Sequence, residues 1–231
     1  MSLIDILRKS MNELHESPIY FIPRLISTSI SSAWFLYMVQ MPDPETYLLT
    51  APLIIFMGLF VPVMVAYMVE NDGGLAEGFR ATLKRSDKVL GSTAAFFLAG
   101  AFTAIPTALG LLIFQISGSF TALALGLLLS IAAILLTGFA SYFLPITLIR
   151  NGVIDGFRES ASFSSENRRE VTALMVFSFL LFGVSAASSG VMQALGTLGF
   201  ILGRLTSALV GTYLIVVSPK YYLEKEKEDE E

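Results

Sequence analysis

Cysteine is absent from this 231-residue chain, and histidine occurs once, as His15. The lack of cysteine excludes disulfides, thiolate metal sites and cysteine nucleophiles. A single histidine, placed beside Glu13 and Glu16, cannot form a metal cluster, so we expect no bound metal. The sequence also has no Ser–His–Asp set and no phosphate-binding loop. These absences predict a protein that is not an enzyme and that needs no cofactor.

Charged residues are also scarce. Lys, Arg, Asp and Glu make up 15% of the chain, and hydrophobic residues make up 54%. A soluble domain has roughly 25% charged residues, so this composition predicts a membrane protein. The net charge of −4 comes from residues 224–231, which contain six acids and two lysines. The rest of the chain is balanced, so we expect no nucleic-acid partner.

Six apolar stretches of about membrane-spanning length follow one another along the chain. No Asp or Glu lies inside any of them, which disfavours a proton relay or a cation-coupled transporter. Short turns, the first being Pro42–Glu45, join them in pairs. The sequence therefore predicts an all-α membrane protein with six transmembrane helices in three hairpins. The stretches cover about residues 20–41, 47–69, 90–115, 120–149, 171–192 and 198–217.

The fourth stretch is longer than a bilayer requires and has Pro145 near its end, which predicts a tilt or a kink.

A nine-residue pattern precedes each hairpin. Residues 74–82 read GLAEGFRAT, residues 152–160 read GVIDGFRES, and residues 2–10, SLIDILRKS, are a looser copy. Each copy has an acid, an arginine three residues later and a hydroxyl residue two beyond that. Each copy also predicts an amphipathic helix. In the third copy we expect this helix to be short, because residues 162–167 read as a polar break.

These copies predict three repeats within one membrane domain, although short interfacial helices can also resemble each other by convergence. Each repeat holds two spans, so all three share one orientation, and an axis along the membrane normal can relate them. The acidic C-terminal residues are expected to form a disordered tail. The predicted boundaries are 2–70, 71–149 and 150–220 for the repeats, 1–223 for the domain and 224–231 for the tail.

Basic residues predict the orientation. Of the 15 Lys and Arg residues, 13 lie outside the predicted spans, and all 13 are on the N-terminal side of the membrane. The three turns on the opposite side contain none. The positive-inside rule therefore places both termini and all three amphipathic helices in the cytoplasm.

Two arginines, Arg24 and Arg204, lie inside predicted spans. A charge at a helix centre costs about 2.5–3.5 kcal/mol on insertion scales, which suggests a functional role. Thr28 and Ser31 share a helix face with Arg24, so this set is a candidate site for a lipid phosphate or another anion. Counted from the span ends, the two arginines differ in height by roughly 15 Å, so we expect no shared site. The alternative is that each arginine only extends to its nearer interface.

Arg80 and Arg158 of the nine-residue copies are further candidates for binding lipid phosphates. The alternative is that each forms an ion pair with the acid three residues earlier.

Small residues recur every four positions along the last span, at Gly199, Gly203, Ser207 and Gly211. Such a ridge is typical of close helix packing in membranes. Its partner is either another span of this chain, which we expect, or a second copy in a homo-oligomer.

The signature at residues 74–82 and 152–160, set before each hairpin, resembles the membrane domain found with some prokaryotic glycerophosphodiester phosphodiesterases. It is also similar to six-span archaeal and bacterial membrane proteins of unknown function. The resemblance implies a membrane-embedded module in a prokaryotic plasma membrane. It does not imply phosphodiesterase activity, because the chain lacks the residues of such a catalytic domain.

We therefore predict a non-enzymatic integral membrane protein that organises lipids or a partner protein. Its expected partners are membrane lipids, with a membrane protein or a second copy as further possibilities. The alternative is a small permease, or a lipid- or anion-translocating protein, with a polar path between the hairpins.

Overall fold

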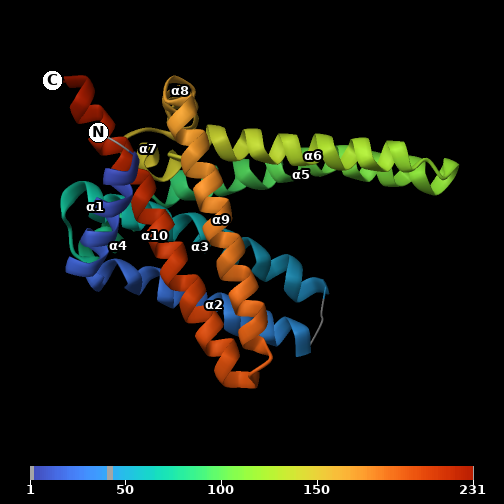
Figure 1. Cartoon of the computed structure of the whole chain (residues 1–231), viewed down its shortest axis with the longest axis horizontal. Coiled ribbons are helices and arrows are strands. Elements are labelled where there is room, and N and C mark those ends of the chain that lie inside the picture. The colour runs from blue at the N-terminus through green and yellow to red at the C-terminus, as the bar shows by residue number, and fades with distance from the viewer. Residues whose placement is uncertain (1–2, 41–43, 231) are drawn as a thin grey trace.

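A computed structural model describes residues 3–40 and 44–230. Within these ranges the protein is all-α, with ten α-helices and the 3-10 turn η1 (Pro18–Tyr20). Three helical hairpins extend from a common region where the chain both begins and ends (Figure 1). This region is termed the hub. Its four short helices are α1 (Leu3–Glu16), α4 (Leu75–Leu83), α7 (Leu144–Arg150) and α8 (Val153–Glu166).

The hairpins are formed by three pairs of long helices. α10 packs against α9, α2 and α3, whereas α5 and α6 pack mainly against each other and leave the hub in a different direction (Figure 1). The expected arrangement of three hairpins around one axis is therefore not seen. The first predicted turn lies largely outside the described residues. The pairs are α2 (Phe21–Gln40) with α3 (Pro44–Asn71), α5 (Ser86–Ser117) with α6 (Phe120–Ala140), and α9 (Arg168–Gln193) with α10 (Gly196–Glu230).

Five helices in the described part of the chain are long and apolar enough to cross a membrane: α3, α5, α6, α9 and α10. Length and composition thus support a multi-pass membrane protein with five of the six predicted spans. α2 is not among the five, because Arg24 and five Ser and Thr residues at positions 27–32 lower its hydropathy. It has 20 residues, or about 30 Å of helix, which still matches the thickness of a bilayer core.

The fourth predicted stretch is two helices rather than one. α6 ends at Ala140, and α7 begins at Leu144 with Pro145 in its first turn. Proline is tolerated there because the first N–H groups of a helix have no partner within that helix. The predicted kink is therefore a break between α6 and α7, and this break directs α7 towards the hub.

The main apolar core lies in the hub. Phe143, in the break before α7, is completely buried. Its ring centroid lies 4.8 Å from that of Phe163 on α8, and 5.7 and 6.0 Å from those of Tyr221 and Tyr222 on α10. Along the hairpins outside the hub, large side chains such as Phe102 are exposed, as expected for contact with lipid. The hub therefore holds the three hairpins together at one end.

The three nine-residue copies bury equivalent positions. The fifth and the ninth residue of each copy are four apart, so they share one helix face. Gly78 allows α4 to approach α3 closely, because an added Cβ would lie 2.7 Å from Cγ of Met68. The same face of all three helices therefore packs into the hub. The buried residues are Ile6 and Ser10 in α1, Gly78 and Thr82 in α4, and Gly156 and Ser160 in α8.

The polar segment at residues 162–167 does not shorten the third amphipathic helix as expected. α8 continues to Glu166, and the Ser162 hydroxyl donates a hydrogen bond to the Glu166 carboxylate at 2.9 Å. Ser164 is buried on the same helix. The serines of this segment therefore belong to a helix, where tertiary packing outweighs their weak helix propensity.

The acidic C-terminal segment is also helical rather than disordered, since α10 continues to Glu230. Glu224 pairs with Lys9 of α1, and Glu226 pairs with Arg150 of α7. Basic residues of the hub thus pair with acidic residues that the sequence pattern placed in a disordered tail.

Candidate functional site

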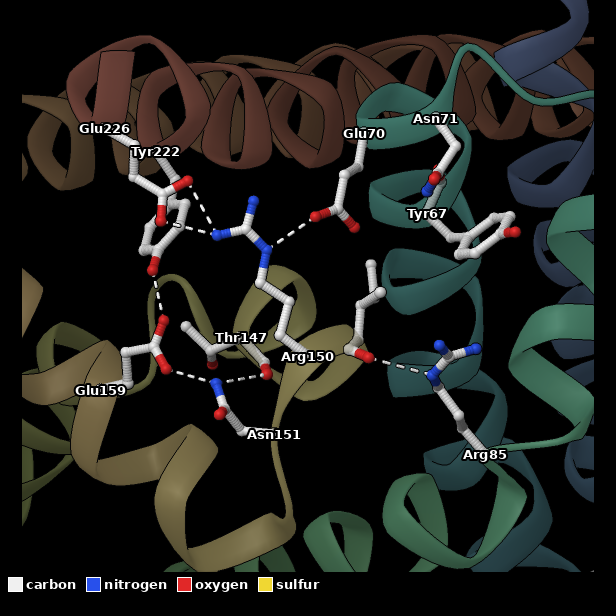
Figure 2. Close-up of polar contacts among 11 residues, drawn as sticks. Tyr67, Glu70, Asn71, Arg85, Thr147, Arg150, Asn151, Glu159, Tyr222 and Glu226 are labelled. Atoms are coloured by element: carbon white, nitrogen blue, oxygen red, sulfur yellow. Dashed lines mark hydrogen bonds and ion pairs between the residues drawn. The ribbon is translucent and has the colours of Figure 1, made fainter. Parts of the chain in front are cut away.

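Arg150 lies at the centre of a polar network in the hub (Figure 2). Its Nε donates to Glu70 of α3 at 2.6 Å, and its Nη1 donates to Glu226 of α10 at 2.6 Å. The guanidinium carbon lies 5.6 Å from the ring centroid of Tyr222. Partial burial lowers the pKa of the Arg150 guanidinium, but the hydrogen bonds to Glu226 and Glu70 raise it by more. The pKa therefore lies above its usual value. This arginine therefore joins α7 to α3 and α10.

Two further groups extend the network (Figure 2). Glu159 of α8 accepts hydrogen bonds from the Tyr222 hydroxyl and from the Asn151 amide. Arg85 donates through Nε to the backbone carbonyl of Ile149 at 3.0 Å, which satisfies an acceptor at the C-terminal end of α7. The charged groups of this network have partners within the chain. We therefore assign it to holding the hub together rather than to binding a ligand.

A cavity of a different character lies between α2, α9 and α10. Its volume is about 290 Å³. Arginine, hydroxyl and glycine residues predominate in its lining, and it contains four residues singled out from the sequence as candidates for anion binding. It is termed the arginine cavity. Its main polar and small lining residues are Arg24, Ser27, Thr28, Ser31, Ser185, Ser189, Arg204, Ser207 and Gly211.

Neither arginine of this cavity forms an ion pair with any residue that the structure describes. The Nε atom of Arg24 is buried and has no hydrogen-bond partner there. Its guanidinium lies against Gly211, where an added Cβ would be 2.9 Å from Nε. Arg204 lies over the Phe200 ring, with its guanidinium carbon 5.3 Å from the ring centroid. The cavity thus holds two positive charges without a counter-charge from the described chain.

The hydroxyl groups of the cavity differ in their hydrogen bonds, and that of Ser31 donates to the Thr28 carbonyl within α2 at 3.1 Å. Those on α9 and α10 bond to one another: the Ser189 hydroxyl lies 3.1 Å from that of Ser207 and donates to the Gly203 carbonyl at 3.0 Å. Those of Ser27 and Thr28 on α2 have no hydrogen bond to a described residue. The α2 side of the cavity therefore presents free donors beside Arg24.

The expectation that Arg24 and Arg204 do not share a site is wrong. It rested on counting each residue from the ends of its own span. α2 crosses α10 so that Arg24 lies beside Gly211. Gly211 is seven residues, or about 10 Å along the helix, from Arg204. Both side chains nevertheless line one cavity across this separation.

The small-residue ridge of α10 contacts different helices along its length. An added Cβ at Gly203 would lie 3.1 Å from Cα of Ser189 on α9, and Gly199 is tighter still against Met192. Gly211, at the other end, faces Arg24 of α2. The ridge therefore brings α9 and α2 of this chain close to α10.

Arg80 and Arg158 lie outside the arginine cavity, on exposed faces of α4 and α8. Neither forms an ion pair with the acid three residues before it, Glu77 or Asp155. At exposed positions such a pair is worth only a few tenths of a kcal/mol and does not hold two long side chains together. Both arginines are accessible from the hub surface.

Ser27, Ser185 and Ser189 line the cavity but were not among the candidate site residues predicted from the sequence. Ser185 and Ser189 are four residues apart on one helix face, a spacing that resembles the ridge of α10. That spacing was a usable signal, but it did not indicate which helix the serines would face.

No group of three or more side chains in residues 3–40 and 44–230 is arranged to hold a metal ion. Comparisons with protein-family models, curated proteins and solved structures find no match to this chain.

Proposed function

We propose that the chain is a non-enzymatic multi-pass membrane protein that binds a phosphate- or carboxylate-bearing ligand in the arginine cavity. One observation carries the proposal: Arg24 and Arg204 line the same cavity and neither pairs with a carboxylate of the described chain. Two like charges in a low-dielectric site repel each other and lose hydration. A bound anion offsets both costs, and the arginine fork matches the geometry of phosphate and carboxylate oxygens.

The membrane placement is part of the proposal. We infer that α2 is a sixth span and that the hub lies in the cytoplasm, so that the arginine cavity lies at membrane depth. The 20-residue length of α2 and the clustering of basic residues on the hub side of the hairpins support this placement. The matching burial of the three nine-residue copies supports an origin as three repeats.

The size of the cavity limits the ligand. Pockets for whole small molecules measure about 300–1,000 Å³, so a cavity of 290 Å³ suits a single anionic group. Two sources supply such a group in a membrane: the headgroup of an anionic lipid and a small free oxyanion. Both present the same oxygen atoms to the arginines, so the binding experiment needs a separate arm for each.

The test uses the full-length protein in nanodiscs. One arm titrates inorganic phosphate into discs of phosphatidylcholine, and the other replaces part of that lipid with phosphatidylglycerol. Thermal unfolding and native mass spectrometry report binding. We expect the parent to respond in one arm and Arg24→Gln to bind about 10- to 100-fold more weakly, as follows from the loss of a charge-assisted hydrogen bond.

Two variants act as controls. Arg169→Gln removes an exposed arginine of α9 that does not line the cavity, and it should bind like the parent. Arg24→Lys keeps the charge but loses the planar fork, and we expect intermediate binding. Equal responses of the parent and Arg24→Gln in both arms would contradict the proposal.

A second function is favoured by one further observation. Thr28 and Arg204 also line a smaller cavity of about 160 Å³ beside the α2–α10 contact. The two cavities thus share polar residues, and these could pass an anion along α2. Phosphate flux into liposomes that is present in the parent and lost in Arg204→Gln would support a permease. Binding without flux would leave the protein as a lipid- or anion-binding module.

A further inference from the structure

A groove of about 540 Å³ lies where α6 and α9 diverge from the hub, with the end of α8 above it. Figure 1 shows the two helices leaving the hub in different directions. The groove is separate from the arginine cavity, because the two share no lining residue. Its lining residues include Leu136, Phe139, Ser165, Arg168, Met175 and Phe179.

The polar residues of this groove gather at its hub end. Arg168 is the first residue of α9, Ser165 lies in the last turn of α8, and Thr172 is one turn further along α9. Arg168 is exposed and forms no ion pair with a described residue. Arg150 and Lys220 in the same hub each have a carboxylate partner. The groove therefore carries a free positive charge at the level where the helices enter the membrane.

The remainder of the groove is apolar. Leu136 of α6 and Phe179 of α9 are more than half exposed. Met175 bridges the helices near the hub, where its Cε lies 3.5 Å from the Cβ position of Gly138. Beyond that contact the two helices part, and their apolar faces are left uncovered. A groove with a cation at one end and an apolar trough behind it is complementary to a lipid headgroup and its acyl chain.

A second cation lies outside the groove, on the helix that carries Ser165. Arg158 lies seven residues before Ser165, which is about two helical turns and so places both on one face of α8. Arg158 is exposed and, like Arg168, forms no ion pair with a described residue. Arg168 in the groove, with Arg158 two turns away on α8, favours a headgroup with a net negative charge over a zwitterionic one.

We infer that this groove binds one anionic phospholipid of the hub-side leaflet, with its phosphate at Arg168 and an acyl chain between α6 and α9. Bound there, the lipid covers the apolar faces that the diverging hairpins leave open. The protein then joins its hairpins through a lipid as well as through the hub. The site is independent of the proposed anion binding between α2, α9 and α10.

Native mass spectrometry of the full-length protein, exchanged from mixed phosphatidylglycerol and phosphatidylcholine nanodiscs, tests this inference. We expect the parent to retain phosphatidylglycerol in preference to phosphatidylcholine. In Arg168→Gln this preference should be about fivefold smaller, because one basic residue near an anionic lipid surface contributes an effect of that size. Arg169→Gln is the matched control, because the neighbouring arginine does not line the groove. It should retain the preference of the parent.

Two further measurements keep the result unambiguous. Val176→Trp fills the apolar part of the groove at a lipid-exposed position, and it should reduce retention of both lipids. Repeating Arg168→Gln in the Arg24→Gln protein should give the same fivefold loss, which separates this site from the arginine cavity. Equal lipid preference in Arg168→Gln and Arg169→Gln would overturn the inference. So would a lipid-independent dimer, since a second copy would then cover the groove.

Discussion

Gly126→Val is expected to destabilise the purified protein by about 3 kcal/mol, at the upper end of overpacking effects. α5 and α6 are in backbone contact at this point. A Cβ on Gly126 would lie 2.4 Å from the carbonyl oxygen of Pro106, and a Cβ on Gly110 would lie 2.7 Å from that of Ala122. Backbone atoms cannot move aside as a flexible side chain can, so valine must separate the two helices.

Separating these helices also breaks polar contacts. The Thr107 hydroxyl lies 2.8 Å from that of Ser130, and the Thr107 backbone N–H donates to the same Ser130 oxygen at 3.2 Å. Bonds of this kind between membrane helices are individually worth about 0.6 kcal/mol. They add to the steric cost, because both depend on the same close approach.

Gly100→Val is the matched control for this prediction. Gly100 lies on α5 of the same hairpin, and nothing lies within 4 Å of an added Cβ there. Thermal unfolding in nanodiscs should show a large loss for Gly126→Val and little change for Gly100→Val. Similar losses at the two positions would show that α5 and α6 do not pack through Gly126.

Phe143→Ala is expected to cost about 3–5 kcal/mol, the usual range for removing a buried phenylalanine. Phe143 is completely buried, and its ring contacts Phe163 of α8 and two tyrosines of α10. The cavity left by alanine would lie where α6 breaks, α8 packs and α10 passes. These elements are fixed by other contacts and cannot all collapse into the space.

Phe102→Ala serves as the comparison, because Phe102 is 69% exposed near the middle of α5. It should change the unfolding temperature little. A comparable loss from both variants would mean that the hub is not the main core of the protein.

The sequence pattern predicted the long helices well, because apolar runs of this length have few other solutions. It also predicted three amphipathic helices, but not which face of each would be buried: in α4, Gly78 and Thr82 are buried, whereas Phe79 is 49% exposed. It could not predict that the fourth apolar stretch breaks at Ser141–Phe143. Pro145 predicts a kink near this point, but the packing of Phe143 with α8 and α10 fixes where the helix breaks.

The ordering of residues 224–230 had a similar cause. The acid run alone is typical of a disordered tail, and its partners Lys9 and Arg150 are more than 70 residues away in sequence. The close packing of α5 and α6 did have a local signal, because Ala122, Gly126 and Ser130 are small residues spaced four apart. This spacing is the same as that of the ridge on α10.

The arginine cavity was predicted in composition but not in geometry. Arg24, Thr28 and Ser31 share a helix face, and periodicity alone groups them. The addition of Arg204 depends on where α2 crosses α10, and hence on the contact of Arg24 with Gly211. Helix crossing is set by side chains of both partners, so a depth count along each span separately gave the wrong answer.

Whether α2 crosses the membrane decides whether the arginine cavity lies within the bilayer. The natural chain has no cysteine, so single cysteines report cleanly. We would place them at Met11 in α1, at Ser162 in α8 and at Ser117 beside the tip of the α5–α6 hairpin, all exposed positions. The measurement is labelling by a membrane-impermeant maleimide in intact cells and after lysis.

We expect Ser117→Cys to be labelled in intact cells, and Met11→Cys and Ser162→Cys to be labelled only after lysis. This result would place both ends of the chain and the hub in the cytoplasm, with α2 as a span. Labelling of Met11→Cys in intact cells, while Ser162→Cys stays protected, would place α1 and α8 on opposite sides of the membrane. It would contradict the six-span arrangement and the position of the arginine cavity within the bilayer.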